Sequence, residues 1–137
     1  MRGRIETRGL KFFFDRSTGK FVPHVLRNLG LDVIIHDEVY YPNKTIPDMR
    51  WVRIWSKRRR IIVQCDKMRD VKKNPAKRDL FVAANARAFL LGGSATRFEM
   101  LRMFFSGWGK MCRIIEKDPG PFIYMIDENG HISQRFP

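Results

Sequence analysis

The sequence predicts an α/β fold, namely a three-layer αβα domain with a central, mostly parallel β-sheet and a C-terminal β-hairpin. Short apolar runs of strand length alternate along the chain with segments of helical periodicity. The runs are apolar at consecutive positions, which is typical of strands buried on both faces of a parallel sheet. We expect residues 1–137 to form one domain, because 137 residues is an ordinary length for a single domain. Residues 1–9 are expected to be a flexible N-terminal segment.

The chain is predicted to open with a strand–helix–strand unit. Residues 10–14 are a Phe-rich strand that Asp15 ends, and residues 18–28 carry apolar side chains at helical spacing. Residues 31–35 form the next strand, and a loop is expected over residues 36–44. Because such crossovers are right-handed, this unit starts a parallel sheet.

The middle of the chain repeats the alternation. A helix is expected from a capping box of Thr45 and Asp48 to about residue 58, followed by a strand over residues 60–65 and a polar loop over residues 67–73. A helix over residues 74–85 with Pro75 at its first position and a strand over residues 86–91 follow. The next predicted helix, over residues 96–117, opens with a Thr96–Glu99 capping box and includes the apolar residues Phe98 and Phe104. Two hairpin strands, over residues 121–126 and 131–136, end the chain.

Charge is the strongest compositional signal. Lys and Arg number 27 against 14 Asp and Glu, so the net charge is +13. A folded domain this basic is typical of a polyanion binder, and nucleic acid is the first candidate. A membrane surface fits less well, because no long basic amphipathic helix with Trp anchors is present.

Other features narrow the class of protein. An apolar content of 44% argues against disorder, and no run of about 18 apolar residues could span a membrane. The charged N-terminus lacks the apolar segment of a secretory signal. Cys65 and Cys112 form no Cys-x-x-Cys pair, so we expect two reduced, buried thiols and a cytoplasmic protein.

Several acidic residues are expected at one edge of the sheet. Asp15 and Asp66 follow predicted strands, Glu38 follows another, and Asp48 opens a helix. Ligands bind outside the carboxyl ends of the strands in open α/β sheets. Clustered carboxylates repel one another unless a cation neutralises them, and their oxygens suit Mg²⁺ or Mn²⁺. A metal ion held by carboxylates can promote phosphodiester hydrolysis. We assign Asp15, Asp48 and Asp66 as the metal ligands and Glu38 as a further catalytic candidate.

Each of these acids also has a purely structural interpretation. Asp15 could cap a helix or close a turn, and Asp66 could make an Asx turn after its strand. Asp48 is explained by the capping box, and Glu38 could be a solvated loop acid.

Basic and aromatic residues near the same edge are candidates for substrate contacts. Arg16, Lys67 and Arg69 are predicted to contact the phosphates. Tyr40 and Tyr41 could stack on a base. His36 has no partner Ser or Cys in a recognisable nucleophile motif, which gives nucleophilic catalysis little support. The tryptophans have helical core spacing and are expected to be buried: Trp51, Trp55 and Trp108.

Over about residues 10–136 the chain carries a series of short motifs, namely Phe12-Phe-Phe-Asp15-Arg, His36-Asp-Glu38, Pro47-Asp48, Cys65-Asp66-Lys67, Gly92-Gly93 and Pro121-Phe-Ile. In their order along the chain, these motifs resemble the PIN-like domain family. They resemble more closely its short group related to VapC-type toxins of toxin–antitoxin operons. One departure is that Gln64-Cys65 precedes Asp66, where such proteins more often have Thr before the Asp.

The resemblance implies a Mg²⁺- or Mn²⁺-dependent ribonuclease fold in which Asp15, Asp48 and Asp66 match the acidic positions, and Glu38 matches less closely. It also implies a cognate antitoxin as partner and a homodimer. The sequence therefore predicts a cytoplasmic endoribonuclease toxin that acts on RNA. A non-catalytic, basic nucleic-acid-binding module remains the alternative from another class, and a nuclease of the same fold that cuts DNA also stays open.

Overall fold

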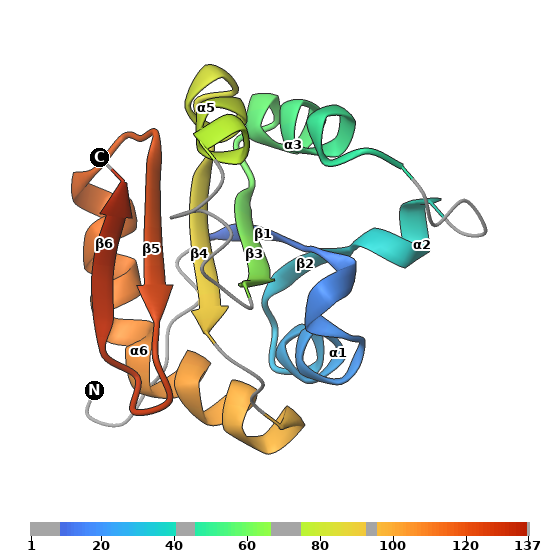
Figure 1. The fold of residues 1–137 in the computed structure, drawn as a ribbon. Helices are drawn as coiled ribbons and strands as arrows, with labels where there is room; N and C mark the ends of the chain where they lie inside the picture. The colour runs from blue at the N-terminus through green and yellow to red at the C-terminus, as the bar shows by residue number, and fades with distance from the viewer. Residues whose placement is uncertain (1–8, 41–45, 67–74, 93–95, 137) are drawn as a thin grey trace.

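A six-stranded sheet runs through the middle of the molecule (Figure 1) in the order β2-β1-β3-β4-β5-β6. The computed structural model describes residues 9–40, 46–66, 75–92 and 96–136. Strands β1 to β5 are parallel, and β6 pairs antiparallel with β5. The strands are β1 (Lys11–Phe14), β2 (Asp32–Ile35), β3 (Ile61–Asp66), β4 (Arg87–Gly92), β5 (Phe122–Ile126) and β6 (Ile132–Phe136).

Helices cover both faces of the sheet, which confirms the predicted three-layer αβα architecture. Helices α1 (Phe21–Asn28) and α6 (Arg97–Lys117) pack on one face, and α3 (Asp48–Lys57) and α5 (Pro75–Ala83) pack on the other. Two short helices, η1 (Arg16–Thr18) and α2 (His36–Tyr40), follow β1 and β2 directly.

The consecutive apolar residues of strand β1 are buried on both faces of the sheet. Phe12 and Phe14 join the core under α1 and α6, whereas Phe13 joins the core on the opposite face. There the Phe13 ring stacks on Trp51 and Trp55 of α3, with centroid separations of 5.1 and 5.2 Å. The prediction that this strand is buried on both faces, and that the tryptophans lie in the core, is confirmed.

The strand order reverses next to β1. The chain moves from β1 to β2 on one side and then returns to β3 on the other side of β1, after which β4 and β5 follow outward. In open α/β sheets, ligands bind outside the carboxyl ends of the strands at such a reversal. Asp15 follows β1 and Asp66 ends β3 at this reversal.

Two predicted boundaries were wrong near the reversal. Residues 36–40 form α2 rather than a loop. Helix α3 begins at Asp48 with Pro47 as N-cap and no side-chain cap, so Asp48 does not close a capping box as its third residue. Proline disfavours helical geometry at the residue before it, which keeps the helix from starting at Ile46. Thr45, the other half of the predicted box, lies outside the described residues.

The C-terminal half follows the prediction more closely. The capping box of Thr96 and Glu99 opens α6 and is confirmed, with the Glu99 backbone N–H donating to Thr96 Oγ1 at 3.2 Å. The β5–β6 hairpin is also confirmed. Cys112 is buried as expected, whereas Cys65 is only half-buried.

Within the described ranges, no helix is long and apolar enough to cross a membrane. The predicted flexible segment, residues 1–9, lies almost wholly outside those ranges, so it remains a prediction, as does the single-domain assignment.

Candidate active site

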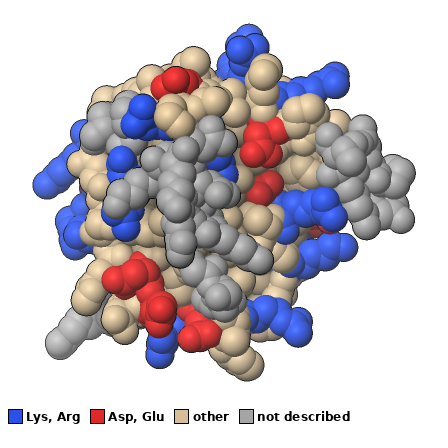
Figure 2. Space-filling model, in the orientation of Figure 1, with Lys and Arg blue, Asp and Glu red and all other residues tan. Residues whose placement is uncertain are grey.

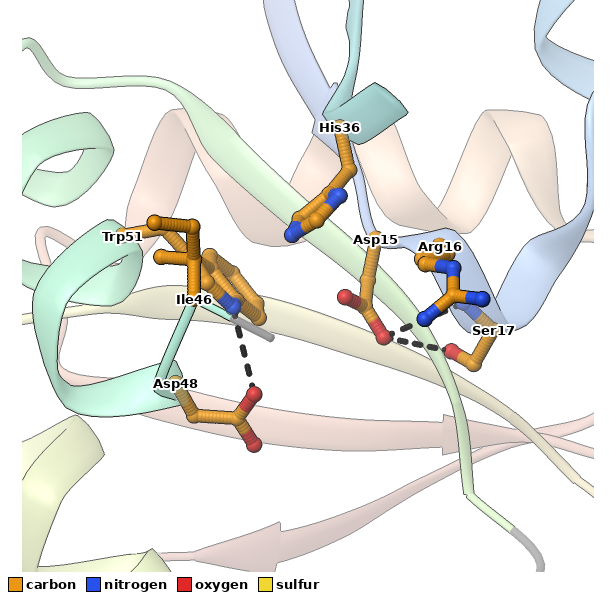
Figure 3. Close-up of a pocket in the computed structure, with 7 residues that line it drawn as sticks. All are labelled: Asp15, Arg16, Ser17, His36, Ile46, Asp48 and Trp51. Atoms are coloured by element: carbon orange, nitrogen blue, oxygen red, sulfur yellow. Dashed lines mark hydrogen bonds between the residues drawn. The ribbon is translucent and has the colours of Figure 1, made fainter. Parts of the chain in front are cut away.

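A polar pocket of about 400 Å³ opens at the carboxyl ends of β1 and β2 (Figure 3). Its walls come from η1, α2 and the start of α3, three segments that the strand order brings together. It is lined by Asp15, Arg16, Ser17, His36, Ile46, Asp48 and Trp51. Two of the three acids predicted as metal ligands, Asp15 and Asp48, therefore share one pocket.

Asp15 is buried and rigidly held. Its backbone N–H donates to Val63 O at 2.9 Å, which fixes the end of β1 against β3. Its Oδ2 accepts hydrogen bonds from the Ser17 hydroxyl at 2.7 Å, the Ser17 backbone N–H at 3.3 Å and Gln64 Nε2 at 3.3 Å. Within the described part of the chain these bonds all fall on Oδ2, and Figure 3 shows the other oxygen directed into the pocket between His36 and Asp48.

Asp48 lies on the opposite wall as the first residue of α3. Its Oδ1 accepts a hydrogen bond from Trp51 Nε1 at 3.1 Å. Partial burial of the carboxyl group raises its pKa above the usual value, and the negative charge of Asp15 raises it further. Lys77, the Trp51 hydrogen bond and His36 oppose that rise in pKa. The two carboxylates are thus close enough to repel, which favours a cation between them.

Ser17 and Gln64 support the carboxylate of Asp15, and sequence reasoning missed both. The Ser17 hydroxyl oxygen also accepts the Cys65 backbone N–H at 2.9 Å, so one side chain joins the ends of β1 and β3. The Gln64 side chain is buried, and its Oε1 has no hydrogen-bond partner among the residues that the structure describes. A buried acceptor beside a carboxylate fits a site that receives a hard cation or its water ligands.

His36 is a further pocket residue whose role was missed. It is 3% exposed and packs against the rings of Phe13, Tyr40 and Trp51. Its Nδ1 lies 3.0 Å from Asp37 Oδ1, which orients the ring. From the sequence we considered His36 only as a member of a nucleophile pair, for which there was little support. The available signal was its position, since a His-Asp pair directly after a strand lies on the ligand-binding edge.

Arg16 lines the pocket from η1 and is the predicted substrate residue that the structure describes. Its Nε lies 3.7 Å from Asp37 Oδ1, and nearly half of its side chain is exposed. The guanidinium therefore sits beside the carboxylates in a position where it can also meet an incoming phosphate.

Glu38 does not line the pocket. Its carboxylate is bound by both terminal nitrogens of the Arg27 guanidinium, with Nη1 at 2.7 Å from Oε2. These hydrogen bonds lower the pKa of Glu38. The Arg27 Nη2 also donates to Val33 O at 2.7 Å, so the pair ties α1 to β2 and α2.

Tyr40, a predicted stacking residue, instead accepts a hydrogen bond from Trp55 Nε1 at 3.1 Å. Tyr41, the other, lies outside the described residues.

Asp66 is the last residue of β3, in register with Gly92 of β4. Its backbone lies at the same sheet edge, whereas its side chain, Lys67 and Arg69 fall outside the described residues. Within the described part of the chain, no group of three Asp, Glu, His or Cys residues could hold a metal ion. The carboxylate oxygens of Asp15 and Asp48, which share the pocket, are of the type that Mg²⁺ and Mn²⁺ prefer.

Comparison with protein families gives one match, to a family described as a PIN like domain, over residues 10–93. The matched segment contains β1 to β4 and every residue that lines the pocket. Neither a curated protein nor a solved structure was found to match the chain.

Proposed function

Because the chain belongs to the PIN-like domain family, whose members are commonly nucleases, we propose that it is a Mg²⁺- or Mn²⁺-dependent endoribonuclease. The observation that carries this proposal is the pair of carboxylates, Asp15 and Asp48, in one polar pocket where the sheet order reverses. We further propose that it is the toxin of a type II toxin–antitoxin pair, a role supported by the resemblance to short VapC-type proteins.

Asp15 and Asp48, together with Asp66 from the end of β3, would hold the metal. When bound, a divalent cation polarises the scissile phosphate and lowers the pKa of an attacking water. The protein contributes fixed geometry, because Ser17 and Gln64 lock one oxygen of Asp15 and leave the other toward the pocket. Such positioning lowers the barrier by removing reorganisation from the reaction step.

The net charge of +13 supports RNA as the partner. Figure 2 shows Lys and Arg side chains spread around one face of the molecule, with acidic side chains in a few small groups. Arg16 beside the carboxylates, with Lys67 and Arg69 after β3, would contact the phosphates on either side of the scissile bond. An acidic antitoxin would complement the same charge, and pairing of two copies is proposed from the family resemblance.

The proposal is tested with labelled total RNA and a matched single-stranded DNA, incubated with EDTA, Mg²⁺ or Mn²⁺. The double variant Asp15→Asn/Asp66→Asn is compared with Asp79→Asn/Glu128→Gln, which changes the same charge at exposed positions outside the pocket. We expect metal-dependent RNA cleavage that the first variant loses by at least about 100-fold and the second retains.

Two outcomes would contradict parts of this proposal. If neither polymer is cut although both are bound in a salt-sensitive way, the protein is a non-catalytic nucleic-acid-binding module. If DNA is cut in preference to RNA, the metal-dependent chemistry stands and the substrate assignment is wrong.

A further inference from the structure

One aromatic surface at the start of α6 is unlike the rest of the molecule. It consists of Phe98, Phe21 and Arg97, and we call it the aromatic platform. Phe98 is 79% exposed, the largest exposed fraction among the large apolar side chains described. Its ring meets Phe21 of α1 edge-on, with centroids 6.2 Å apart, and the Arg97 guanidinium lies 5.7 Å above the Phe21 ring.

The fold does not require an aromatic residue at position 98. Helix α6 is capped by Thr96 and Glu99, and its buried face is supplied by residues further along, such as Phe104 and Trp108. A phenylalanine that leaves most of its surface in water gains little from folding. Its exposed ring is therefore available to a binding partner.

The aromatic platform lies on the same edge of the sheet as the pocket. Phe21 follows the pocket residue Ser17 by four positions, which is at most about 14 Å of extended chain. Figure 1 shows α1 beside the first turns of α6, and α6 follows the carboxyl end of β4. A strand bound at the pocket can reach the platform without crossing the molecule.

The charges around the platform favour an anionic partner. Arg97 and Lys20 are exposed, and each directly precedes one of the two phenylalanines in the sequence. The acid in this turn, Glu99, is engaged in the capping box, where its Oε1 accepts the Thr96 backbone N–H at 2.8 Å. A flat apolar ring next to exposed cationic side chains matches a nucleotide, which offers a base to stack and a phosphate to neutralise.

We propose that the aromatic platform stacks an unpaired base of single-stranded RNA that passes through the pocket. This inference rests on the proposed function for its choice of RNA, and it adds a base-stacking contact that lies outside the pocket. A base paired in a duplex presents its face to its neighbours and cannot stack on Phe98. A protein partner is less well matched, because one projecting ring is far smaller than the roughly 800 Å² that a stable interface covers on each side.

The test measures binding in an Asp15→Asn background, so that substrate is not consumed. Fluorescence anisotropy follows a labelled, unstructured RNA of about 12 nucleotides and a duplex of the same sequence. We expect Phe98→Ala and Phe98→Leu to weaken single-strand binding by about 5- to 100-fold and duplex binding by less than about twofold, while Phe98→Trp retains single-strand binding. Phe105→Ala is the control, because Phe105 is a partly exposed phenylalanine two turns further along α6.

Single-strand binding that is unchanged in Phe98→Ala would overturn the inference, as would full binding by Phe98→Leu or an equal loss in Phe105→Ala. If Phe98→Ala instead abolishes self-association seen by analytical ultracentrifugation and leaves RNA binding intact, the surface is a contact between copies. Failure of the proposed function can be distinguished from failure of this inference. If the wild-type protein cleaves no RNA but still needs Phe98 to bind single strands, the proposed cleavage is contradicted and the stacking contact is not.

Discussion

At the level of single residues, the two pocket carboxylates are held in different ways. Asp15 is buried and receives its described hydrogen bonds on one oxygen, from Ser17 and Gln64. Asp48 has one hydrogen bond, from Trp51, and a raised pKa caused first by burial and then by Asp15. In the proposed metal site, Asp15 would therefore be the preorganised ligand, and Asp48 would be the carboxylate whose charge a cation most needs to neutralise.

The raised pKa of Asp48 predicts a pH-dependent effect on stability. Folding favours the protonated carboxyl, so its contribution is fully present below the ordinary value of 3.8 and is lost as pH rises through the raised pKa. Asp48→Asn should therefore raise Tm at pH 7 in EDTA by about 1–3 °C, and this gain should vanish below about pH 4. Asparagine keeps the acceptor for Trp51.

Thermal unfolding at pH 7 and at pH 3, followed by circular dichroism, checks this prediction. Asp79→Asn is the matched control, since Asp79 is exposed and does not line the pocket. A gain for Asp48→Asn that is the same at pH 7 and pH 3, or a lower Tm at pH 7, would contradict the raised pKa of Asp48 in the folded protein.

Sequence reasoning identified the acids of the pocket but not their supports. Asp15 could be predicted because it ends an apolar strand, which is a local signal. The bond from Gln64 to Asp15 joins residues 49 positions apart, and it depends on the register between β1 and β3. Register of parallel neighbours follows from packing of the whole sheet, so no local pattern could show this contact.

At the level of elements, α6 contains two glycines that a helix alone does not explain. Gly107 is buried, and a Cβ there would lie 3.2 Å from Ile132 Cδ1 of β6 and 3.6 Å from the carbonyl oxygen of Gly130. Gly109 is exposed, with Arg113 Nη1 as its nearest neighbour at 3.8 Å. Gly107 therefore allows the hairpin to approach α6, whereas Gly109 has no such role in the described structure.

This difference gives a paired prediction. Gly109→Ala should stabilise the protein by about 0.5–1 kcal/mol, the usual difference in helix propensity between the two residues. Gly107→Ala brings the same propensity but crowds Ile132, so its gain should be smaller by at least about 0.5 kcal/mol. Urea unfolding of both variants measures the difference. Equal gains would mean that the hairpin does not pack closely on α6.

Elements were predictable where the signal is local. The capping box of α6 and the turn of the β5–β6 hairpin lie within a few residues, and both form as expected. Helix α2 was missed because five residues are too few to show helical periodicity. The exposure of Phe98 was not predicted either, because helical periodicity assigns apolar residues to the buried side of a helix.

For the whole molecule, the alternation of strands and helices predicted the layers and the parallel sheet but not the order of the strands. The order β2-β1-β3-β4-β5-β6 places the reversal at β1 and β3, and so decides where the pocket lies. A molecule with a net charge of +13 thus holds two carboxylates in one pocket, and this combination is the basis of the metal-dependent nuclease that we propose.

The central claim, that the pocket carboxylates hold a divalent cation, is tested most directly by Mn²⁺ binding. The electron paramagnetic resonance signal of free Mn²⁺ is followed as protein is added, for the wild type, Asp15→Asn, Asp48→Asn and the control Asp79→Asn. We predict that the wild type and the control bind Mn²⁺, and that each pocket variant binds it at least about tenfold more weakly. Equal Mn²⁺ binding by all four proteins would contradict the account.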